Sequence, residues 1–371
     1  MAALGLSDKE IGGLATISMA AQVFFALISG PLVDKYGRRL ITFLGDLMAW
    51  GIPCLIFACS QNFIWFVAGT VLSGTVSVVN NAWTLLMIED CDPKMLVSIY
   101  SLTSIAGLLS VFFAPISTLL IAHYALVPVM RGLYLFAFVM MTLKCALLYR
   151  FSTETQQGAQ RKVETRHTSI FRSAVFLKDA LQKIRHNPAT PPVMAMFILF
   201  NIGSVVSGNF FSLFITRNLS IPDQYVALFP ILRSLIMLVF FCGLQHILSR
   251  YRFQKPMLLG LGLYVAATLA LIVPWAGGWA RTIVYTVLEA CAYSIVSPRK
   301  DSLVAIFVEK HERARITGLL YMAMLLVSAP FGWIAGVLAT KNQGYPFLLN
   351  LGVFLLFFLL VAVTRKRVEV E

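Results

Sequence analysis

The chain has 371 residues, of which 58% are hydrophobic and only 13% are charged, and its mean hydropathy is +0.80. A soluble domain is typically about half apolar and a quarter charged, so this chain has too little polar surface to coat a globule in water. The composition therefore excludes a soluble globular protein and predicts a polytopic membrane protein.

Continuous apolar runs account for most of the sequence. A helix that crosses the hydrocarbon core of a bilayer needs about 20 apolar residues. Because the runs are continuous rather than alternating, a transmembrane β-barrel is excluded and an all-α polytopic fold is expected. Eleven segments qualify as spans, at residues 11–30, 40–59, 62–87, 96–122, 129–149, 192–216, 224–247, 256–275, 279–303, 314–339 and 345–364.

The net charge of +13 follows a membrane topology rather than a nucleic-acid surface. If the charged loop at residues 34–39 is cytoplasmic, 23 of the 30 Lys and Arg residues lie on the inner side and five on the outer side. Cytoplasmic loops carry such an excess of Lys and Arg. The distribution therefore predicts that the central loop and the C-terminus are cytoplasmic.

One polar stretch, residues 151–191, separates five spans from six. It divides the chain into an N-terminal helical bundle at 1–150, a linker at 151–191 and a C-terminal helical bundle at 192–371. Between Ile170 and Ile184 apolar residues recur at roughly helical spacing, which indicates an amphipathic helix on the inner membrane surface or a solvated linker helix.

The two halves of the sequence repeat short patterns at a nearly constant offset. Leu6–Ser7 recurs 213 residues later, Thr70–Leu72 recurs after 216 and Ala114–Pro115 after 215. A steady offset with the same order of helices indicates an internal repeat. Shifted back by this offset, the counterpart of span 192–216 falls before Met1. We therefore expect the first half to lack its opening helix, through a start codon placed too far downstream or a genuine truncation.

The stretch Gly30–Arg39 reads GPLVDKYGRR. It resembles the loop between helices two and three of major facilitator superfamily transporters, whose pattern is G-x-L-[AV]-D-[RK]-[YF]-G-R-[RK], and it matches every fixed position. The number of spans, the long central loop and the repeat extend the resemblance over essentially the whole chain. It implies two pseudo-symmetric bundles, six plus six helices in the family, with eleven spans present here.

The resemblance assigns roles within this motif. Gly30 permits a close approach of helices and Gly37 a tight turn. Asp34 is implied to lie against the inner N-terminus of the family's eleventh helix, near 315–318, where the helix dipole favours a carboxylate. Arg38 is implied to pair with an acid at the inner end of the fourth helix. Together these contacts form a latch on the cytoplasmic side, with Gly30, Asp34, Gly37, Arg38, Arg39, Glu89 and Asp90 as its expected members.

A simpler interpretation of this motif is positive-inside anchoring, although anchoring would not need Asp34. The corresponding loop of the second half, residues 243–255, carries Ile247 where the offset places the aspartate. We therefore expect a second latch to be weaker or absent.

Two ionisable residues lie deep within the predicted spans. Glu289 is about 15 Å, and Arg233 about 12 Å, from the outer end of its span at 1.5 Å per residue. Similar depths make an ion pair plausible, either as a substrate-anion or proton site or as a permanent structural pair. Nearer the inner edge, we interpret Lys144 as snorkelling and Asp46 as part of the charge network of the loop.

Polar uncharged side chains gather on two spans. The resemblance implies that the equivalent helices, four and seven, border a central cavity, where amides could bind a polar substrate and Trp83 could stack on it. Alternatively, the amides hydrogen-bond between helices. The candidate residues are Asn80, Asn81, Trp83, Asn201 and Asn209.

These features favour a secondary transporter that moves a small solute by alternating access, with its substrate near the midplane. No G-x4-GK[ST] motif occurs, so the energy would come from an ion gradient, most simply protons through Glu289. We expect no organic cofactor and no metal. The expected partners are a small-molecule substrate and the lipid bilayer, not nucleic acid, for a monomeric protein of the plasma membrane.

Two other function classes, an intramembrane enzyme and a family member without transport activity, fit the sequence less well. An intramembrane enzyme is disfavoured, because no GxSxG or HExxH motif occurs and no histidine lies near mid-span, so no catalytic residue is assigned. A degenerate or truncated family member without transport activity is the main alternative. The substrate is either a polar or anionic metabolite or an amphipathic drug, carried by a symporter or an antiporter.

Overall fold

Every regular element in the described part of the computed structural model is a helix, as the sequence predicts. The structure describes residues 4, 6, 8–92, 95–111, 120, 123–166, 190–222, 225–226, 228–243, 254–307 and 313–364.

Each expected span contains a described helix. Eight helical segments are long and apolar enough to cross a membrane, and α6 and α13 are shorter apolar helices. The 30-residue helix α16 is less apolar because it carries five charged residues, among them Glu289. The spans correspond to α1 (Asp8–Tyr36), α2 (Arg38–Asp46) with the π-turn Leu47–Gly51 and α3 (Ile52–Cys59), α4 (Phe63–Ser73) with α5 (Val76–Ile88), α6 (Leu96–Val111), α8 (Leu126–Phe151), α12 (Thr190–Arg217), α13 (Leu228–Gly243), α15 (Gln254–Ile272), α16 (Gly278–Phe307), α17 (Arg313–Lys341) and α18 (Tyr345–Val363).

The chain forms two compact units that interleave along the sequence. One comprises Met1–Asp92, Phe113–Ile184 and Val308–Leu325, and the other comprises Pro93–Phe112, Arg185–Phe307 and Leu326–Glu371. The sequence-based domains are continuous instead, and their division at the linker stays a prediction.

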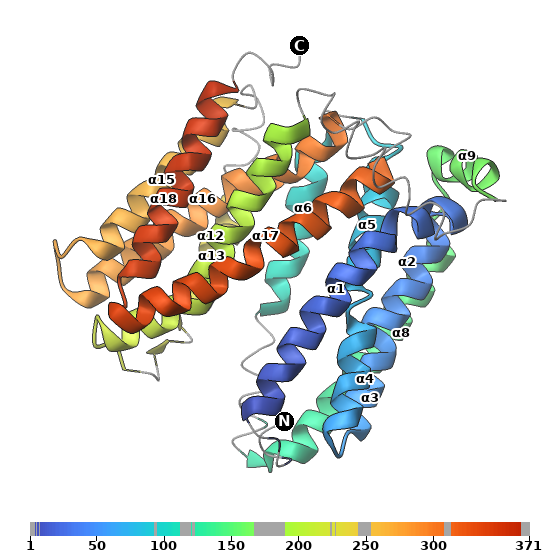
Figure 1. The fold of residues 1–371 in the computed structure, drawn as a ribbon, viewed down its shortest axis with the longest axis horizontal. Helices are drawn as coiled ribbons and strands as arrows, with labels where there is room; N and C mark the ends of the chain where they lie inside the picture. Colours follow the sequence, from blue (N-terminus) through green and yellow to red (C-terminus); the bar gives the residue numbers. More distant parts are fainter. Residues whose placement is uncertain are drawn as a thin grey trace. The chain divides into compact units, whose positions relative to one another are not determined.

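In the first unit, α1 packs against α4 and α5, and α8 packs against α2 and α3 (Figure 1). Apolar side chains of α1, α2 and α5 meet the start of α17 in a buried cluster that includes Val33, Ile41, Leu85 and Ala314. This cluster fixes the end of α1 that carries the motif.

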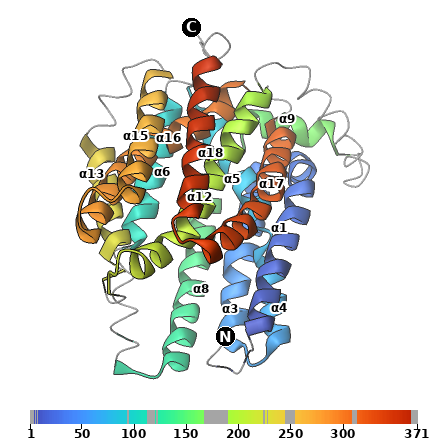
Figure 2. The same cartoon turned by 60° about the vertical axis from the view of Figure 1, so that its left-hand side comes forward.

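In the second unit, α15 packs against α16 and α18, and α12 packs against α18 and α16 (Figure 2). Helix α6 packs on α13 and α16, through a cluster of Leu108, Met237, Phe241 and Ala290. At the other end of this unit, large side chains such as Phe214, Phe229 and Phe347 form a second buried cluster.

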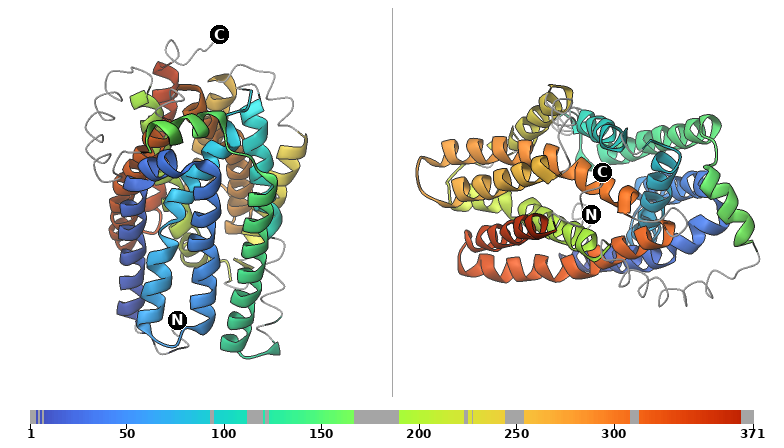
Figure 3. Two further views of the ribbon diagram at one scale, coloured as in Figure 1. Left: turned by 90° about the vertical axis from the view of Figure 1, so that its right-hand side faces the viewer. Right: turned by 90° about the horizontal axis from the view of Figure 1, so that it is seen from above.

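A short helix of the linker, α9 (Gln156–Glu164), lies against α1 near the motif (Figure 3, left). Thr155 is its N-cap and accepts a hydrogen bond from the backbone N–H of Gly158. The sequence predicts a linker helix at 170–184 instead, and that segment lies outside the described residues. Helix α9 is therefore an element that the apolar pattern missed.

Candidate functional site

The motif forms a tight junction between α1 and α2. Gly37 separates the two helices with φ of 91°, in the left-handed region that favours glycine. A Cβ atom at Gly30 would lie only 2.7 Å from the Cα atom of Arg315. Both glycine roles that the resemblance implies, the turn and the close approach to the helix now seen as α17, are therefore present.

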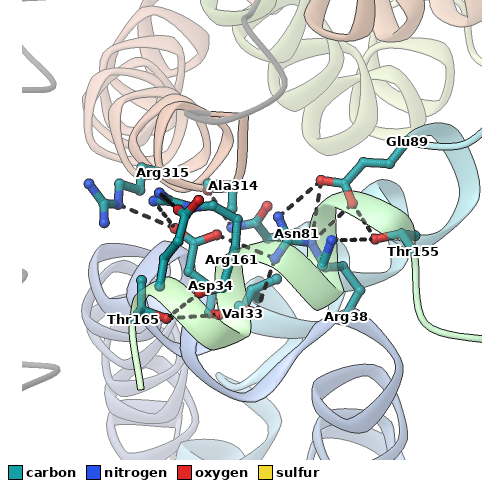
Figure 4. Close-up of polar contacts among 12 residues, drawn as sticks. Val33, Asp34, Arg38, Asn81, Glu89, Thr155, Arg161, Thr165, Ala314 and Arg315 are labelled. Atoms are coloured by element: carbon teal, nitrogen blue, oxygen red, sulfur yellow. Dashed lines mark hydrogen bonds and ion pairs between the residues drawn. The ribbon is translucent and has the colours of Figure 1, made fainter. Parts of the chain in front are cut away.

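Asp34 is the centre of a buried charge cluster. Its side chain is 1% exposed and lies within 3.4 Å of Arg38, 3.0 Å of Arg161 and 3.3 Å of Arg315 (Figure 4). Three guanidinium groups thus surround one carboxylate, which offsets the cost of removing it from water. The expected position of Asp34 at the start of α17 is confirmed.

Arg38 makes the second buried contact of the latch. Its Nη2 and Nε atoms donate to the two carboxylate oxygens of Glu89 at 3.0 and 3.1 Å, and neither side chain is exposed. Of the two acids offered by the sequence, Glu89 is therefore the partner. Asp90 is exposed, and its carboxylate accepts a hydrogen bond from the backbone N–H of Gln156 at 3.2 Å.

Arg39 turns away from this cluster to the end of α8. Its Nε donates to the backbone carbonyl of Tyr149 at 3.1 Å, and its guanidinium lies 4.2 Å from the centre of the Tyr149 ring. A cation is favourable at a helix C-terminus, because the last carbonyls have no partner within the helix. Arg39 therefore joins α2 to α8.

The linker completes the latch, which the sequence did not predict. The Glu154 carboxylate accepts from the backbone N–H groups of Arg38 and Arg39 at 2.8 and 3.2 Å, so it caps α2 from a distant part of the chain. The Thr155 hydroxyl donates to Glu89 at 2.5 Å. Thr165 donates to the backbone carbonyl of Asp34 at 3.1 Å.

Arg161 is the cation that the linker brings to Asp34. Burial disfavours its charge, but the hydrogen bonds and negative charges of Asp34 and, to a lesser extent, Glu164 outweigh burial and raise the pKa of Arg161 above its ordinary value. The charged form is therefore secured by the contact. A polar helix with Thr at its N-cap was the only local signal for this segment.

Asn81 lies among the buried contacts between helices near the motif. Its side chain is fully buried and donates to the Ser29 hydroxyl at 3.0 Å and to the Ala314 carbonyl at 2.8 Å. It thus ties α5 to α1 and α17 within the first unit, as expected for an amide between helices. Its neighbours Asn80 and Trp83 are exposed and half-buried, respectively.

The second unit contains a cavity of about 470 Å³ that holds the other predicted pair. Arg233 of α13 donates to Glu289 of α16 through Nε at 2.6 Å and through Nη2 at 3.0 Å. The Arg233 guanidinium also lies 4.7 Å from the centre of the Tyr293 ring. The pairing inferred from equal depth is therefore present, and it lines a cavity rather than closed packing.

The wall of the cavity combines hydroxyl groups with aromatic rings. Helix α12 contributes Ser204 and Ser207, so its polar segment does reach the cavity, but Asn201 and Asn209 do not line it. The sequence did not identify the large aromatic side chains of the wall, because aromatic residues that line a cavity look the same in sequence as aromatic residues that face lipid. The aromatic side chains of the wall are Phe211, Phe229, Tyr264, Tyr285, Tyr293 and Phe354.

Asp46 and Lys144 form a separate ion pair within the spans of the first unit, at 2.7 Å. The expectation that Asp46 joins the charge network of the loop was wrong, because its carboxylate is paired with Lys144 of α8 instead. Asp46 is 3% exposed whereas Lys144 is 47% exposed. The long lysine side chain thus covers a buried carboxylate.

The described residues contain no group of three His, Cys, Asp or Glu side chains that could hold a metal ion.

The chain resembles proteins of one superfamily in sequence and in fold. A stretch of 72 residues is 40% identical to the nitrate/nitrite transporter NrtP of Picosynechococcus sp., which is 19% of this chain but only 13% of that protein. The fold is similar to the human organic anion transporter MFSD10, with a TM-score of 0.75 and 20% identity over 97% of this chain and 87% of the other. It is also similar to the proton:xylose symporter XylE, with a TM-score of 0.75 and 12% identity over 99% and 88% of the two chains.

The family model of the Major Facilitator Superfamily matches residues 1–298, which is most of the sequence and includes both the latch motif and Glu289. The chain therefore belongs to the major facilitator superfamily.

Proposed function

We propose that this protein is a secondary transporter that moves a small solute across the plasma membrane by alternating access. The observation that carries the proposal is the Arg233–Glu289 pair, which opens into a cavity of about 470 Å³. That volume lies within the range of about 300–1,000 Å³ that is typical of small-molecule sites.

Two further observations support transport. The family model matches, and the three similar proteins named above are all transporters. The excess of Lys and Arg on the side of the motif supports a cytoplasmic latch. In this proposal the contacts of Asp34 and Arg38 hold that side closed and separate when the protein opens inward.

Proton coupling is assigned to Glu289. The groups that face it are Arg233 of α13, Tyr264 of α15, and Tyr285 and Tyr293 of α16. Arg233 is the cation among them and donates to the carboxylate at 2.6 Å. A substrate that draws on Arg233 leaves Glu289 with less compensation, so Glu289 takes up a proton as the substrate binds.

The test is transport by purified protein in liposomes that contain the pH dye pyranine. Labelled nitrate, xylose and 4-hydroxybenzoate are offered in turn with and without an imposed pH gradient. We expect Glu289→Gln to abolish accumulation driven by the gradient while sparing exchange of substrate for substrate. Glu10→Gln, at the far end of α1, should change neither. Unchanged coupling in Glu289→Gln would remove this residue as the proton carrier, and no movement of any compound by wild-type protein would favour a degenerate family member.

A further inference from the structure

The Arg233 guanidinium has a second edge that its partner leaves open. A guanidinium can bind one carboxylate through Nε and Nη2 and another through Nη1 and Nη2. Glu289 occupies the first of these edges, with contacts of 2.6 and 3.0 Å. Nη1 donates no hydrogen bond to any of the described residues. Arg233 can therefore accept a second carboxylate without releasing Glu289.

The accessible charge of the pair is the positive one. The Arg233 side chain is 34% exposed, whereas the Glu289 side chain is 10% exposed. An incoming anion meets the guanidinium directly. An incoming cation would first have to displace Arg233 both from Glu289 and from the Tyr293 ring, 4.7 Å away. The geometry thus favours anions over cations.

A neutral hydrogen-bond donor lies in the same cavity. Ser207 accepts from the side-chain amide of Asn350 at 2.8 Å and from the Tyr285 hydroxyl at 3.4 Å. Since a hydroxyl oxygen has two acceptor positions, both are used and the Ser207 proton remains to be donated. Ser207 therefore has a proton that it can donate to an acceptor atom of a ligand.

The rest of the wall suits a flat apolar body. Phe211 and Tyr285 are stacked with their ring centres 5.2 Å apart, and Phe229 stands at 87° to Phe211 at 6.0 Å. Offset and edge-on contacts of this kind extend readily to a further aromatic ring. A small inorganic anion would leave most of this apolar surface unused.

We propose that the cavity binds an organic monoanion, with its carboxylate on the open edge of Arg233 and its flat apolar body against Phe211, Phe229 and Tyr285. This inference rests on the proposed function only in taking the cavity as the site of transport. Binding itself requires nothing but the residues of the second unit.

The test compares three probes of the same shape. Binding of 2-naphthoate, 2-naphthamide and 2-naphthylmethylammonium to the detergent-purified full chain is measured by isothermal titration calorimetry. We expect naphthoate to bind at least about tenfold more tightly than the amide, because a charge-assisted bidentate contact replaces neutral hydrogen bonds. The ammonium compound should bind most weakly. Tighter binding of the ammonium compound, or no binding of any probe to a monodisperse protein, overturns the proposal.

Variants of three cavity residues locate the anion. Arg233→Lys keeps the charge but lacks the planar edge, so naphthoate should bind roughly tenfold more weakly. Ser207→Ala removes one neutral donor and should weaken binding about threefold. Glu289→Gln removes the negative charge that shares the guanidinium and repels a second carboxylate, so it should tighten naphthoate binding roughly tenfold. If Glu289→Gln instead weakens naphthoate binding, the anion does not share Arg233 and the proposal is wrong.

Transport by the same preparation separates the two proposals. If naphthoate binds as expected but 4-hydroxybenzoate, a smaller aromatic monoanion, is not moved in liposomes, the substrate class holds and the transport function fails. If xylose or nitrate is moved and naphthoate does not bind, the transport function holds and the substrate class fails. Protein that has lost its fold is recognised in either assay by its elution on size exclusion.

Discussion

Arg38 and Glu89 form a two-bond ion pair, at 3.0 and 3.1 Å, in which neither side chain is exposed. The pair joins the start of α2 to the end of α5. Removing one partner of such a pair leaves the other with a buried charge that is less well compensated, which destabilises the fold. The stability of the first unit therefore depends on both members.

Glu89→Gln should destabilise the protein by about 1.5–3 kcal/mol, because Arg38 loses its charge-assisted hydrogen bonds to Glu89 and keeps only the more distant carboxylate of Asp34 among the described side chains. The measurement is thermal unfolding of purified protein, followed with a thiol-reactive dye whose signal rises above that of the exposed Cys59 and Cys242 as the buried thiol of Cys145 becomes exposed. Asp90→Asn is the matched control, since Asp90 is the next residue and is exposed. Equal melting temperatures for the two variants would contradict the role of Glu89.

Gly30→Ala should weaken the contact between α1 and α17, because the new Cβ would lie 2.7 Å from a backbone atom of Arg315 and the backbone cannot give way as a side chain can. We expect a lower melting temperature and, under the proposed function, altered transport. Gly13→Ala is the control on the same helix, where an added Cβ meets nothing within 4 Å. A Gly30→Ala protein as stable and as active as Gly13→Ala would show that the close approach is not needed.

Arg161→Gln should release α9 from the latch. Loss of a hydrogen bond to a charged group should make local unfolding of α9 roughly tenfold more frequent. The measurement is the hydrogen-exchange rate of the backbone amides of α9. Lys162→Gln, an exposed neighbour on the same helix, should leave the exchange unchanged.

The effect of Arg161→Gln should also be independent of pH across the neutral range. Asp34 raises the pKa of Arg161, so the stabilisation is fully present below the ordinary arginine pKa and is lost only as the pH rises through the still higher folded value. A difference between wild type and variant that disappears within the neutral range would argue against this ion pair.

Lys144→Gln should destabilise the second span, because it leaves the buried carboxylate of Asp46 without its partner at 2.7 Å. The double variant Asp46→Asn, Lys144→Gln should recover part of that loss. Thermal unfolding of wild type, of the single variants Asp46→Asn and Lys144→Gln, and of the double variant gives the coupling free energy of the pair, for which we expect about 0.5–3 kcal/mol. Additive effects of the two single changes would mean that the pair contributes nothing.

Most of the fold was predictable, because apolar runs and turn residues are local signals. The bounds of α12, α15 and α18 differ from the predicted spans by at most three residues. The positions of Gly37, Asp34 and Arg38 were predicted from the resemblance of the motif to a family pattern, not from the physical properties of the residues. The pairing of Arg233 with Glu289 was predicted from the depth of each residue in the membrane. Residues at similar depths on neighbouring helices lie at the same level and can meet.

The rest depends on contacts between distant segments. Glu154 and Arg161 belong to a polar stretch, and nothing in its composition shows that it packs on the motif. Tyr285 and Tyr293 look the same in sequence as aromatic residues that face lipid. Asn81 could equally have lined a cavity, and only its contacts with Ser29 and Ala314 assign it to helix packing.

The cap that Glu154 provides for α2 has a consequence for how the protein is made. The backbone N–H of Arg38 and the carboxylate that accepts its hydrogen bond are 116 residues apart in the chain. While the ribosome is still adding the intervening segments, the start of α2 lacks this partner and depends on water or lipid headgroups. The capping contact forms only after the span that precedes Glu154 has been synthesised, so insertion of the second span precedes its final docking. The linker thus completes the cap of α2, whereas the contacts of Asn81 with Ala314 and of Asp34 with Arg315 wait until the start of α17 has been synthesised.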